Sequence, residues 1–329
     1  MIDFKLIPLG AKPSPPDERD YPISRLAATV NVFPDNFIIP YAHTIKSQGA
    51  ISSCVSHSLS YCREIVEEKQ NNKYIEFSDG FIYANRESSD YQGEGMYPRE
   101  ALNSLKKYGI VPKEVFPYND LYPLLRNRLN ANRSMYMEKA EPYKISSYCR
   151  LYSANEIKNA LMQLGPVTIT LPMYMSFYNS GYVIKRHNPT EKLLGYHQVT
   201  ITGWKNVNGL SYWMILNSWG NTWGDKGFGL LDPTYEITEA WSITDNILPH
   251  PEVQPEKQKY WRVQLGAFAV KRNCEKLQNE LGKKGIGTYM VFIDNLYKLQ
   301  LGAFAIKENA IRKQQEMINM GYSTYLINY

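Results

Sequence analysis

A cysteine near the start of a predicted helix is the first candidate for chemistry in this sequence. Apolar side chains recur after Cys54 at the spacing of one helix face, which predicts a helix over residues 54–69 with Ser53 as its N-cap. The unpaired N–H groups of a first helical turn favour a thiolate, so Cys54 would be a strong nucleophile. To cleave an amide, it also needs a base and a group that orients the base.

Two of the five histidines are candidates for that base. His57 lies three residues after Cys54 on the same predicted helix, which leaves little room for a substrate carbonyl between the two side chains. His197 begins the predicted strand YHQVTITGW and comes from a distant part of the chain. We therefore expect His197 to face Cys54 across a cleft and to accept its proton.

An amide side chain on the next predicted strand is placed to orient this histidine. Asn217 lies in WMILNSWG, and Asn208 with Gly209 is a strong hairpin signal between the two strands. A two-residue turn would put Asn217 on the opposite face from His197, so the sequence predicts a bulge that returns both to one face. The Asn217 amide oxygen then accepts from one imidazole N–H and leaves the other nitrogen to face sulfur.

Gln48, six residues before Cys54, supplies a hydrogen-bond donor. Its side-chain NH2 and the backbone N–H of Cys54 can donate to the oxygen that becomes negative in a tetrahedral intermediate. Trp219 is expected to shield the Asn217 to His197 hydrogen bond from water, although an aromatic core residue would give the same pattern. The four cysteines are scattered without metal-ligand spacing, so we expect reduced thiols and neither a metal nor a cofactor.

The elements that must position these residues fall into two parts. Short helices and Gly-rich turns precede Leu164 and strands follow it, which predicts a helical lobe, a strand lobe and a cleft between them. Further on, PHPEVQPEKQK has the composition of a linker. We expect a leader that straps onto the domain over residues 1–30, a catalytic domain over 31–248, a linker over 249–259 and a second domain over 260–329.

The second domain contains an internal repeat. RVQLGAFAVK and KLQLGAFAIK are offset by 36 residues, and each is followed by a helical run and another strand. The two halves are too small to be stable alone, so we expect one four-stranded sheet with both helices on one face. Alternation along the strands leaves four polar side chains on the open face, and we call these the platform residues: Arg262, Gln264, Lys298 and Gln300.

The duplicated QLGAFA resembles the SPOR domain, a βαββαβ module whose open sheet binds peptidoglycan glycan strands stripped of stem peptides. The resemblance implies that the platform residues contact glycan; a ferredoxin-like sandwich without a ligand is the alternative. From residue 257 onward there are 12 Lys and Arg against 5 Asp and Glu, which favours an anionic partner or a solvated basic helix face. No nucleic acid partner is expected, because the platform lacks a dense array of arginine and aromatic side chains.

The catalytic domain resembles the papain-like C1 cysteine peptidases. Gln48, Cys54 and His197 occur in the family's order and are followed by NSWGNTWGDKGFG, which begins at Asn217. The resemblance implies an α+β chain: a papain-like two-lobe fold, with a helical lobe and a β-barrel-like lobe, followed by the small ferredoxin-like SPOR fold. It implies peptide-bond hydrolysis through a thiolate–imidazolium pair and an acyl-enzyme, with Gln48 in the oxyanion hole.

The same resemblance assigns the substrate side of the site. GPVTIT matches the family segment that borders the substrate's P2 side chain, and GEGMYP matches the loop whose backbone pairs with substrate. ISSCV replaces the usual CGSCW, so the family's nearby disulfide is missing. The leader is shorter than the usual inhibitory propeptide, so autoinhibition by a long prosegment is not expected. The expected substrate-binding residues are Trp219, Thr170, Met173, Met96 and Gly95.

Together these features predict a cysteine endopeptidase that acts on proteins or peptides and is held at the bacterial cell wall by peptidoglycan glycan strands. The alternative is a catalytically inert papain-like protein that binds peptides and is anchored to peptidoglycan. The sequence shows neither a recognisable signal peptide nor a segment that could span a bilayer, so synthesis in the cytoplasm is expected. A phage- or spore-associated lytic role would explain how the protein reaches the wall.

Overall fold

The computed structural model describes residues 7–18, 20–28, 32–86, 94–119, 121–245, 260–304 and 307–328 of the 329. The chain divides into two compact units, Met1–His250 and Pro251–Tyr329, and each has its own hydrophobic core. The expected linker lies outside the described residues, as does the start of the leader. In the described part of the chain, no helix combines the length and the apolar character needed to cross a membrane.

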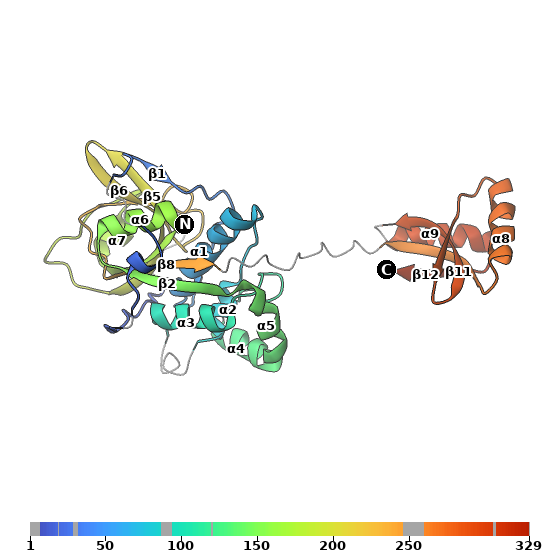
Figure 1. The fold of residues 1–329 in the computed structure, drawn as a ribbon, viewed down its shortest axis with the longest axis horizontal. Coiled ribbons are helices and arrows are strands. Elements are labelled where there is room, and N and C mark those ends of the chain that lie inside the picture. Colours follow the sequence, from blue (N-terminus) through green and yellow to red (C-terminus); the bar gives the residue numbers. More distant parts are fainter. Residues whose placement is uncertain are drawn as a thin grey trace. The chain divides into compact units, whose positions relative to one another are not determined.

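The N-terminal unit starts with an extended leader that includes one 3-10 turn, Ile23–Arg25, and continues into a lobe of helices (Figure 1). The helices enclose an apolar core that contains Phe81 and Leu102. Their bounds are α1 Cys54–Asn71, α2 Asp79–Ala84, α3 Pro98–Tyr108, α4 Tyr122–Ala131 and α5 Arg133–Ala140, followed by the 3-10 turn Glu141–Tyr143.

Helix α1 is buried on every side. The sequence predicts a single apolar face, but all residues from Cys54 to Glu67 are buried, which corrects the amphipathic assignment. The buried charges are tolerated because they are paired: Arg63 lies 2.7 Å from Asp245 and 2.9 Å from Glu67. Cys62, on the apolar face of this helix, is 1% exposed. The candidate nucleophile therefore starts a helix that the surrounding unit holds in place.

The strand lobe is built on an eight-stranded sheet with the order β2-β8-β3-β5-β6-β7-β4 and with β1 paired to β5. The predicted succession of a helical lobe and a strand lobe is thus confirmed. The strands are β1 Phe37–Ile38, β2 Ile145–Leu151, β3 Val167–Met173, β4 Val183–Ile184, β5 Gly195–Val207, β6 Leu210–Leu216, β7 Phe228–Leu231 and β8 Glu239–Asp245, and two helices accompany them, α6 Ala154–Gln163 and α7 Met175–Asn179.

The hairpin of β5 and β6 contains the bulge that the sequence predicts. Its turn is tight, and the register of the two strands then shifts between Ile201 and Gly203. The single extra residue changes the alternation of faces along β5. Asn217, directly after β6, therefore lies on the same face as His197.

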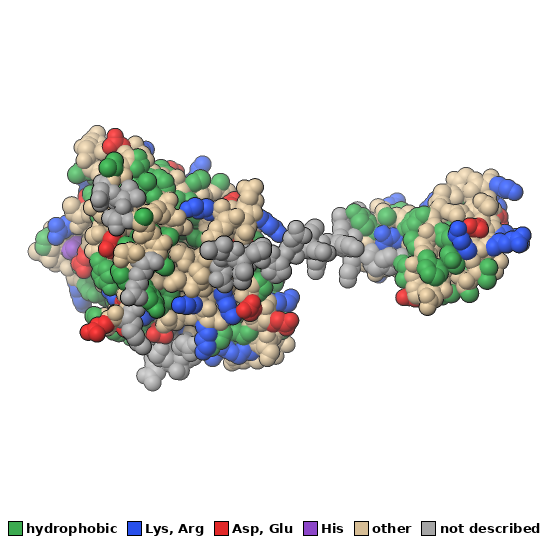
Figure 2. Space-filling view, in the orientation of Figure 1, with side chains coloured by type: hydrophobic (Ala, Val, Ile, Leu, Met, Phe, Trp, Pro, Cys, Tyr) green, Lys and Arg blue, Asp and Glu red, His purple; other side chains and the backbone are tan. Residues whose placement is uncertain are grey.

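The C-terminal unit has the predicted βαββαβ plan, with an antiparallel sheet of order β10-β11-β9-β12. Both helices pack on the face of the sheet that carries Val263 and Leu299. On the face seen in Figure 2, the Lys and Arg side chains of this unit lie at several separate places. The elements are β9 Trp261–Phe268, α8 Lys271–Lys283, β10 Tyr289–Ile293, β11 Leu296–Phe304, α9 Lys307–Asn319 and β12 Tyr325–Asn328.

The open face of this sheet is less polar than the sequence predicts. Arg262, Gln264 and Lys298 are partly exposed, but Gln300 is fully buried, which corrects its assignment as an exposed contact. Gln300 pairs with Gln264 on one side and with Tyr289 on the other. It is buried because β11 lies inside the sheet, where the side chains of Gln264 and Tyr289 flank Gln300 on both sides.

Candidate active site

Cys54 is the first residue of α1, and its side chain is fully buried. Ser53 occupies the N-cap position, but its hydroxyl makes no capping hydrogen bond and contacts the Tyr118 hydroxyl at 2.9 Å instead. Burial raises the pKa of the Cys54 thiol to about 11, and the backbone amides of Gln198 and Gly10 oppose this shift. Since Gln198 follows His197 on β5, the thiol lies beside the strand that carries the candidate base.

His197 is fully buried, and its Nε2 lies 2.8 Å from Asn217 Oδ1. The same oxygen accepts from the backbone N–H of Ser218, so it is an acceptor and Nε2 carries the proton. Within the described residues, Nδ1 of His197 has no hydrogen-bond partner. Burial lowers the pKa of His197 to about 4. The ring is therefore neutral, and Nδ1 presents the lone pair that a general base needs.

Trp219 covers the histidine. The ring centroids of Trp219 and His197 are 4.9 Å apart. The Tyr178 ring stacks on Trp219, with the centroids 5.3 Å apart. Trp219 is 1% exposed, so it is placed to exclude water from the hydrogen bond between His197 and Asn217.

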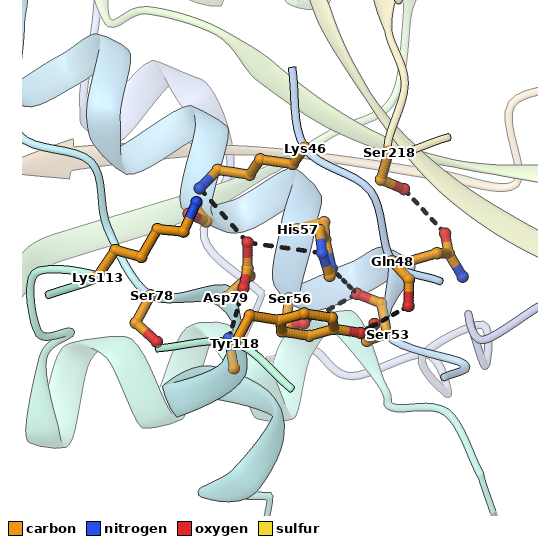
Figure 3. Close-up of polar contacts among 12 residues, drawn as sticks. Lys46, Gln48, Ser53, Ser56, His57, Ser78, Asp79, Lys113, Tyr118 and Ser218 are labelled. Atoms are coloured by element: carbon orange, nitrogen blue, oxygen red, sulfur yellow. Dashed lines mark hydrogen bonds and ion pairs between the residues drawn. The ribbon is translucent and has the colours of Figure 1, made fainter. Parts of the chain in front are cut away.

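Gln48 is fully buried beside the first turn of α1. Ser218 Oγ donates to Gln48 Oε1 at 2.9 Å, which turns the amide so that Nε2 points to the carbonyl oxygens of Pro8 and Ile51 at 2.9 and 3.1 Å. The Ser218 to Gln48 contact is drawn in Figure 3. The donor assigned to the oxyanion therefore already binds a carbonyl, and that carbonyl belongs to the leader.

The leader crosses the site in an extended conformation. Met96 N–H donates to Gly10 O at 2.9 Å, Lys12 N–H donates to Met96 O at 2.9 Å, and Ala11 N–H donates to Tyr196 O at 3.2 Å. The two hydrogen bonds of Met96 form a parallel bridge between Ala11 and Met96. The leader therefore lies along the catalytic unit at these residues, and Gly10 also contacts the buried Cys54 thiol through its backbone.

A buried carboxylate that the sequence analysis missed holds the next part of the leader. Glu239 Oε1 accepts from the backbone N–H of Ser14 and from Thr170 Oγ1, each at 3.1 Å. Glu239 Oε2 accepts from Trp241 Nε1 at 3.0 Å. No sequence motif marks this glutamate; only its position on β8 brings it to the leader.

The other residues that the sequence predicts to bind substrate lie close to the leader or in the core of the strand lobe. Met96 pairs with the leader through its backbone, as described above, and Gly95 packs so tightly that a Cβ there would lie 2.4 Å from Gly10 O. Thr170 is buried and reaches the leader through Glu239. Met173 is fully buried in the apolar cluster of the strand lobe, which also includes Ile7 of the leader.

Comparison with known proteins decides the family. The model of the papain family of cysteine proteases matches residues 39–243. The chain belongs to this family. A second family model, that of the SPOR domain, matches residues 257–328, in agreement with the repeat.

Individual papain-family relatives match only part of the chain. A cysteine protease of Blomia tropicalis is 28% identical over 198 residues, which cover 57% of each chain. Mouse cathepsin K is 26% identical over 196 residues, or 58% of this chain and 56% of the relative. The chain thus spans a little over half the length of these curated relatives.

Solved structures show the same papain-like fold. Xylellain, a cysteine protease from Xylella fastidiosa, superposes with a TM-score of 0.62 at 22% identity and covers 72% of this chain and 96% of its own. Procathepsin B S9 from Trypanosoma congolense gives a TM-score of 0.60 at 18% identity, with 72% and 86% covered. At this level of identity the likeness shows the fold alone.

Proposed function

We propose that this papain-family chain is a cysteine endopeptidase in which Cys54 is the nucleophile and His197 is the base. The observation that carries the proposal is the His197 ring, whose Nε2–H is held by Asn217 while Nδ1 is unpartnered within the described residues and lies on the strand beside the thiol. This is the arrangement that a cysteine nucleophile needs for acyl transfer.

The reaction follows from these positions. The thiol proton moves to Nδ1 of His197 as sulfur bonds to the substrate carbonyl carbon, and the carbonyl oxygen becomes negative. Gln48 Nε2 and the Cys54 N–H donate to that oxygen. When the C–N bond breaks, the imidazolium returns the proton to the leaving amine, and water then hydrolyses the thioester and frees Cys54.

The form with the leader in place is a resting form. Burial raises the pKa of Cys54 to about 11 and lowers the pKa of His197 to about 4, so the two groups are a neutral thiol and a neutral imidazole. The expected thiolate–imidazolium pair therefore requires that the leader leave and that water reach the thiol. Glu239 and Gln48 would then be available to a substrate.

Substitution of Cys54 tests the peptidase proposal. Cys54→Ala should abolish hydrolysis of casein and of a peptide library, because no other group in this site supplies a nucleophile. Cys62→Ala is the matched control, since Cys62 is another buried thiol on α1 and should leave hydrolysis largely intact. Equal product formation by wild type and Cys54→Ala, read by mass spectrometry, would rule out Cys54 as the nucleophile, and no product from either protein would leave the inert peptide-binding alternative.

We further propose that the C-terminal unit holds the enzyme on peptidoglycan glycan strands and thereby places its activity at the bacterial cell wall. Support comes from the SPOR family match and from one row of residues across the open sheet face, where the partly exposed Gln264 lies between Tyr325 and the buried Gln300, and Tyr289 follows on β10. Tyrosine rings beside amide groups are suited to sugar rings and hydroxyls. The two tyrosines were not among the expected contacts.

Binding to purified sacculi tests this second part. Gln264→Ala should weaken co-sedimentation with sacculi about 2- to 13-fold, the value of one hydrogen bond of about 0.5–1.5 kcal/mol. Lys313→Ala is the control, because Lys313 lies on α9, on the opposite face of the sheet. Wild-type binding by Gln264→Ala, or equal loss in both variants, would remove the open face from glycan recognition.

A further inference from the structure

His57 is the candidate base that the reaction does not use, and it lies in a buried polar network behind Cys54. The ring is 1% exposed, and its Nδ1 lies 2.9 Å from the carbonyl oxygen of Ser53. Figure 3 shows the ring between Ser53 on one side and Asp79 on the other. Since a carbonyl oxygen only accepts hydrogen bonds, Nδ1 must carry a proton.

The second ring nitrogen also faces acceptors. Nε2 of His57 lies 3.5 Å from Asp79 Oδ2, and the backbone carbonyl of Ser47 acts on the same ring. Burial lowers the pKa of His57, whereas Asp79 and the carbonyls of Ser53 and Ser47 oppose that shift. A neutral ring with its proton on Nδ1 would direct a lone pair at the Asp79 carboxylate, so the approach of Nε2 to that carboxylate favours a proton on both nitrogens.

With Lys46, Glu64 and Asp79 all charged, the cluster balances when His57 is a cation. Burial raises the pKa of Glu64, and the charge and hydrogen bond of Lys46 oppose that shift. Lys46 Nζ lies 2.8 Å from Glu64 and 3.4 Å from Asp79, and all three side chains are nearly inaccessible to solvent. An imidazolium makes two cations against two anions, whereas a neutral ring leaves one uncompensated buried negative charge, which is costly. At the rim, Lys113 and Glu76 pair at 2.6 Å and balance each other.

The groups that His57 contacts precede the two oxyanion donors. Ser53 is followed by Cys54, whose N–H is one donor, and Ser47 is followed by Gln48, whose amide is the other. Tyr118 connects the same two segments: its hydroxyl donates to Gln48 O at 2.6 Å and contacts Ser53 Oγ at 2.9 Å. The edge of the Tyr118 ring meets the His57 ring at 4.9 Å.

We infer that His57, as an imidazolium paired with Asp79, is a positioning residue that fixes the backbone on either side of the oxyanion site. The ring acts through Ser53 and Ser47 and touches neither substrate nor the reacting atoms. Loss of His57 should slow the step in which negative charge develops on the substrate oxygen. Misplaced donors weaken the stabilisation of that charge more than they weaken substrate binding. The inference rests on the proposed peptidase function.

Kinetics of the full chain test the positioning role. His57→Phe keeps an aromatic ring but removes both N–H donors, and kcat should fall about 10- to 100-fold while KM changes less than about threefold. His57→Asn should recover much of the loss, because the Asn amide can donate to Ser53 O in place of Nδ1. His43→Phe is the control, since His43 pairs with Glu68 and is linked to the cluster only indirectly, through the Tyr41 ring that it contacts, so its loss should leave kcat unchanged.

The outcomes separate this inference from the proposed function. Wild-type kcat in His57→Phe, or a loss that Asn does not relieve and that parallels a lower melting temperature, would overturn the positioning role. Nitrogen-15 NMR of the ring in Cys54→Ala reads the charge state without any activity: two protonated nitrogens at pH 7 are expected, and a neutral ring contradicts the inference. If wild type cleaves no peptide, the proposed peptidase function fails instead, and with it the catalytic role of His57.

Discussion

Gly10→Ala should raise the rate at which Cys54 reacts with iodoacetamide, and the rate of peptide hydrolysis, by about 5- to 150-fold. The leader passes the site so closely that a Cβ on Gly10 would lie 2.0 Å from the carbonyl oxygen of Ser52. Overpacking of this kind costs about 1–3 kcal/mol, and each 1.4 kcal/mol shifts an equilibrium about tenfold. The cost falls on the form with the leader in place, because the clash disappears when the leader leaves.

The pH dependence of alkylation gives an independent reading of the same change. With the leader in place, burial raises the pKa of Cys54 to about 11, so the thiol is protonated and slow to react below that pH. Once water reaches the sulfur, this cause of the shift weakens, and the midpoint of the alkylation profile should move to lower pH. Gly181→Ala is the control, since a Cβ there meets no atom. An unchanged rate and midpoint in Gly10→Ala would show that the leader does not limit access.

The relation between Asn217 and His197 was predictable from the sequence because strand geometry is nearly rigid. A tight turn fixes the pairing of every later residue in a hairpin, so the requirement that both side chains share a face demands one extra residue. The register shift between Ile201 and Gly203 supplies that residue. The repeat in the C-terminal unit was readable for a similar reason, since period-two alternation leaves few arrangements for four strands and two helices.

The path of the leader had no such signal in the sequence. The leader binds through backbone groups of Gly10, Ala11 and Lys12, and backbone hydrogen bonds are available to almost any residue type. Its one distinctive residue is Gly10, and only the neighbouring Ser52 carbonyl shows why a glycine is needed there. The length of the leader argues only against inhibition by a long prosegment, and a few residues are enough to cover one thiol.

The burial of charged residues was equally hidden. Periodicity predicts a single apolar face on α1, but Arg63 and Glu64 are buried as well, because their partners Asp245 and Lys46 come from distant segments of the chain. Gln300 shows the same error on the sheet, because alternation gives the face of a side chain but not how far its neighbours cover it. Both errors have one cause. Local sequence patterns indicate which face of a helix or strand a side chain takes, whereas long-range contacts determine whether that side chain is buried.

Gln48→Glu should lower kcat for peptide hydrolysis about 100- to 1000-fold, equivalent to about 2.7–4 kcal/mol of transition-state stabilisation. The change preserves the shape of the side chain and an acceptor for Ser218 Oγ, but it replaces the NH2 donor with a carboxylate oxygen. It also removes the hydrogen bond from Gln48 Nε2 to Pro8 O, which weakens the hold on the leader.

The two consequences of Gln48→Glu have opposite signs, and together they identify the role of Gln48. Alkylation of Cys54 forms no oxyanion, so its rate should be maintained or increased, whereas amide hydrolysis should fall steeply. Measuring both rates in the Gly10→Ala background removes the contribution of the leader. Ser218→Ala is the matched control, because it removes a partner of Gln48 and keeps the donor. A parallel fall in both rates would indicate damage to the thiol site, and no fall in hydrolysis would exclude Gln48 from the oxyanion site.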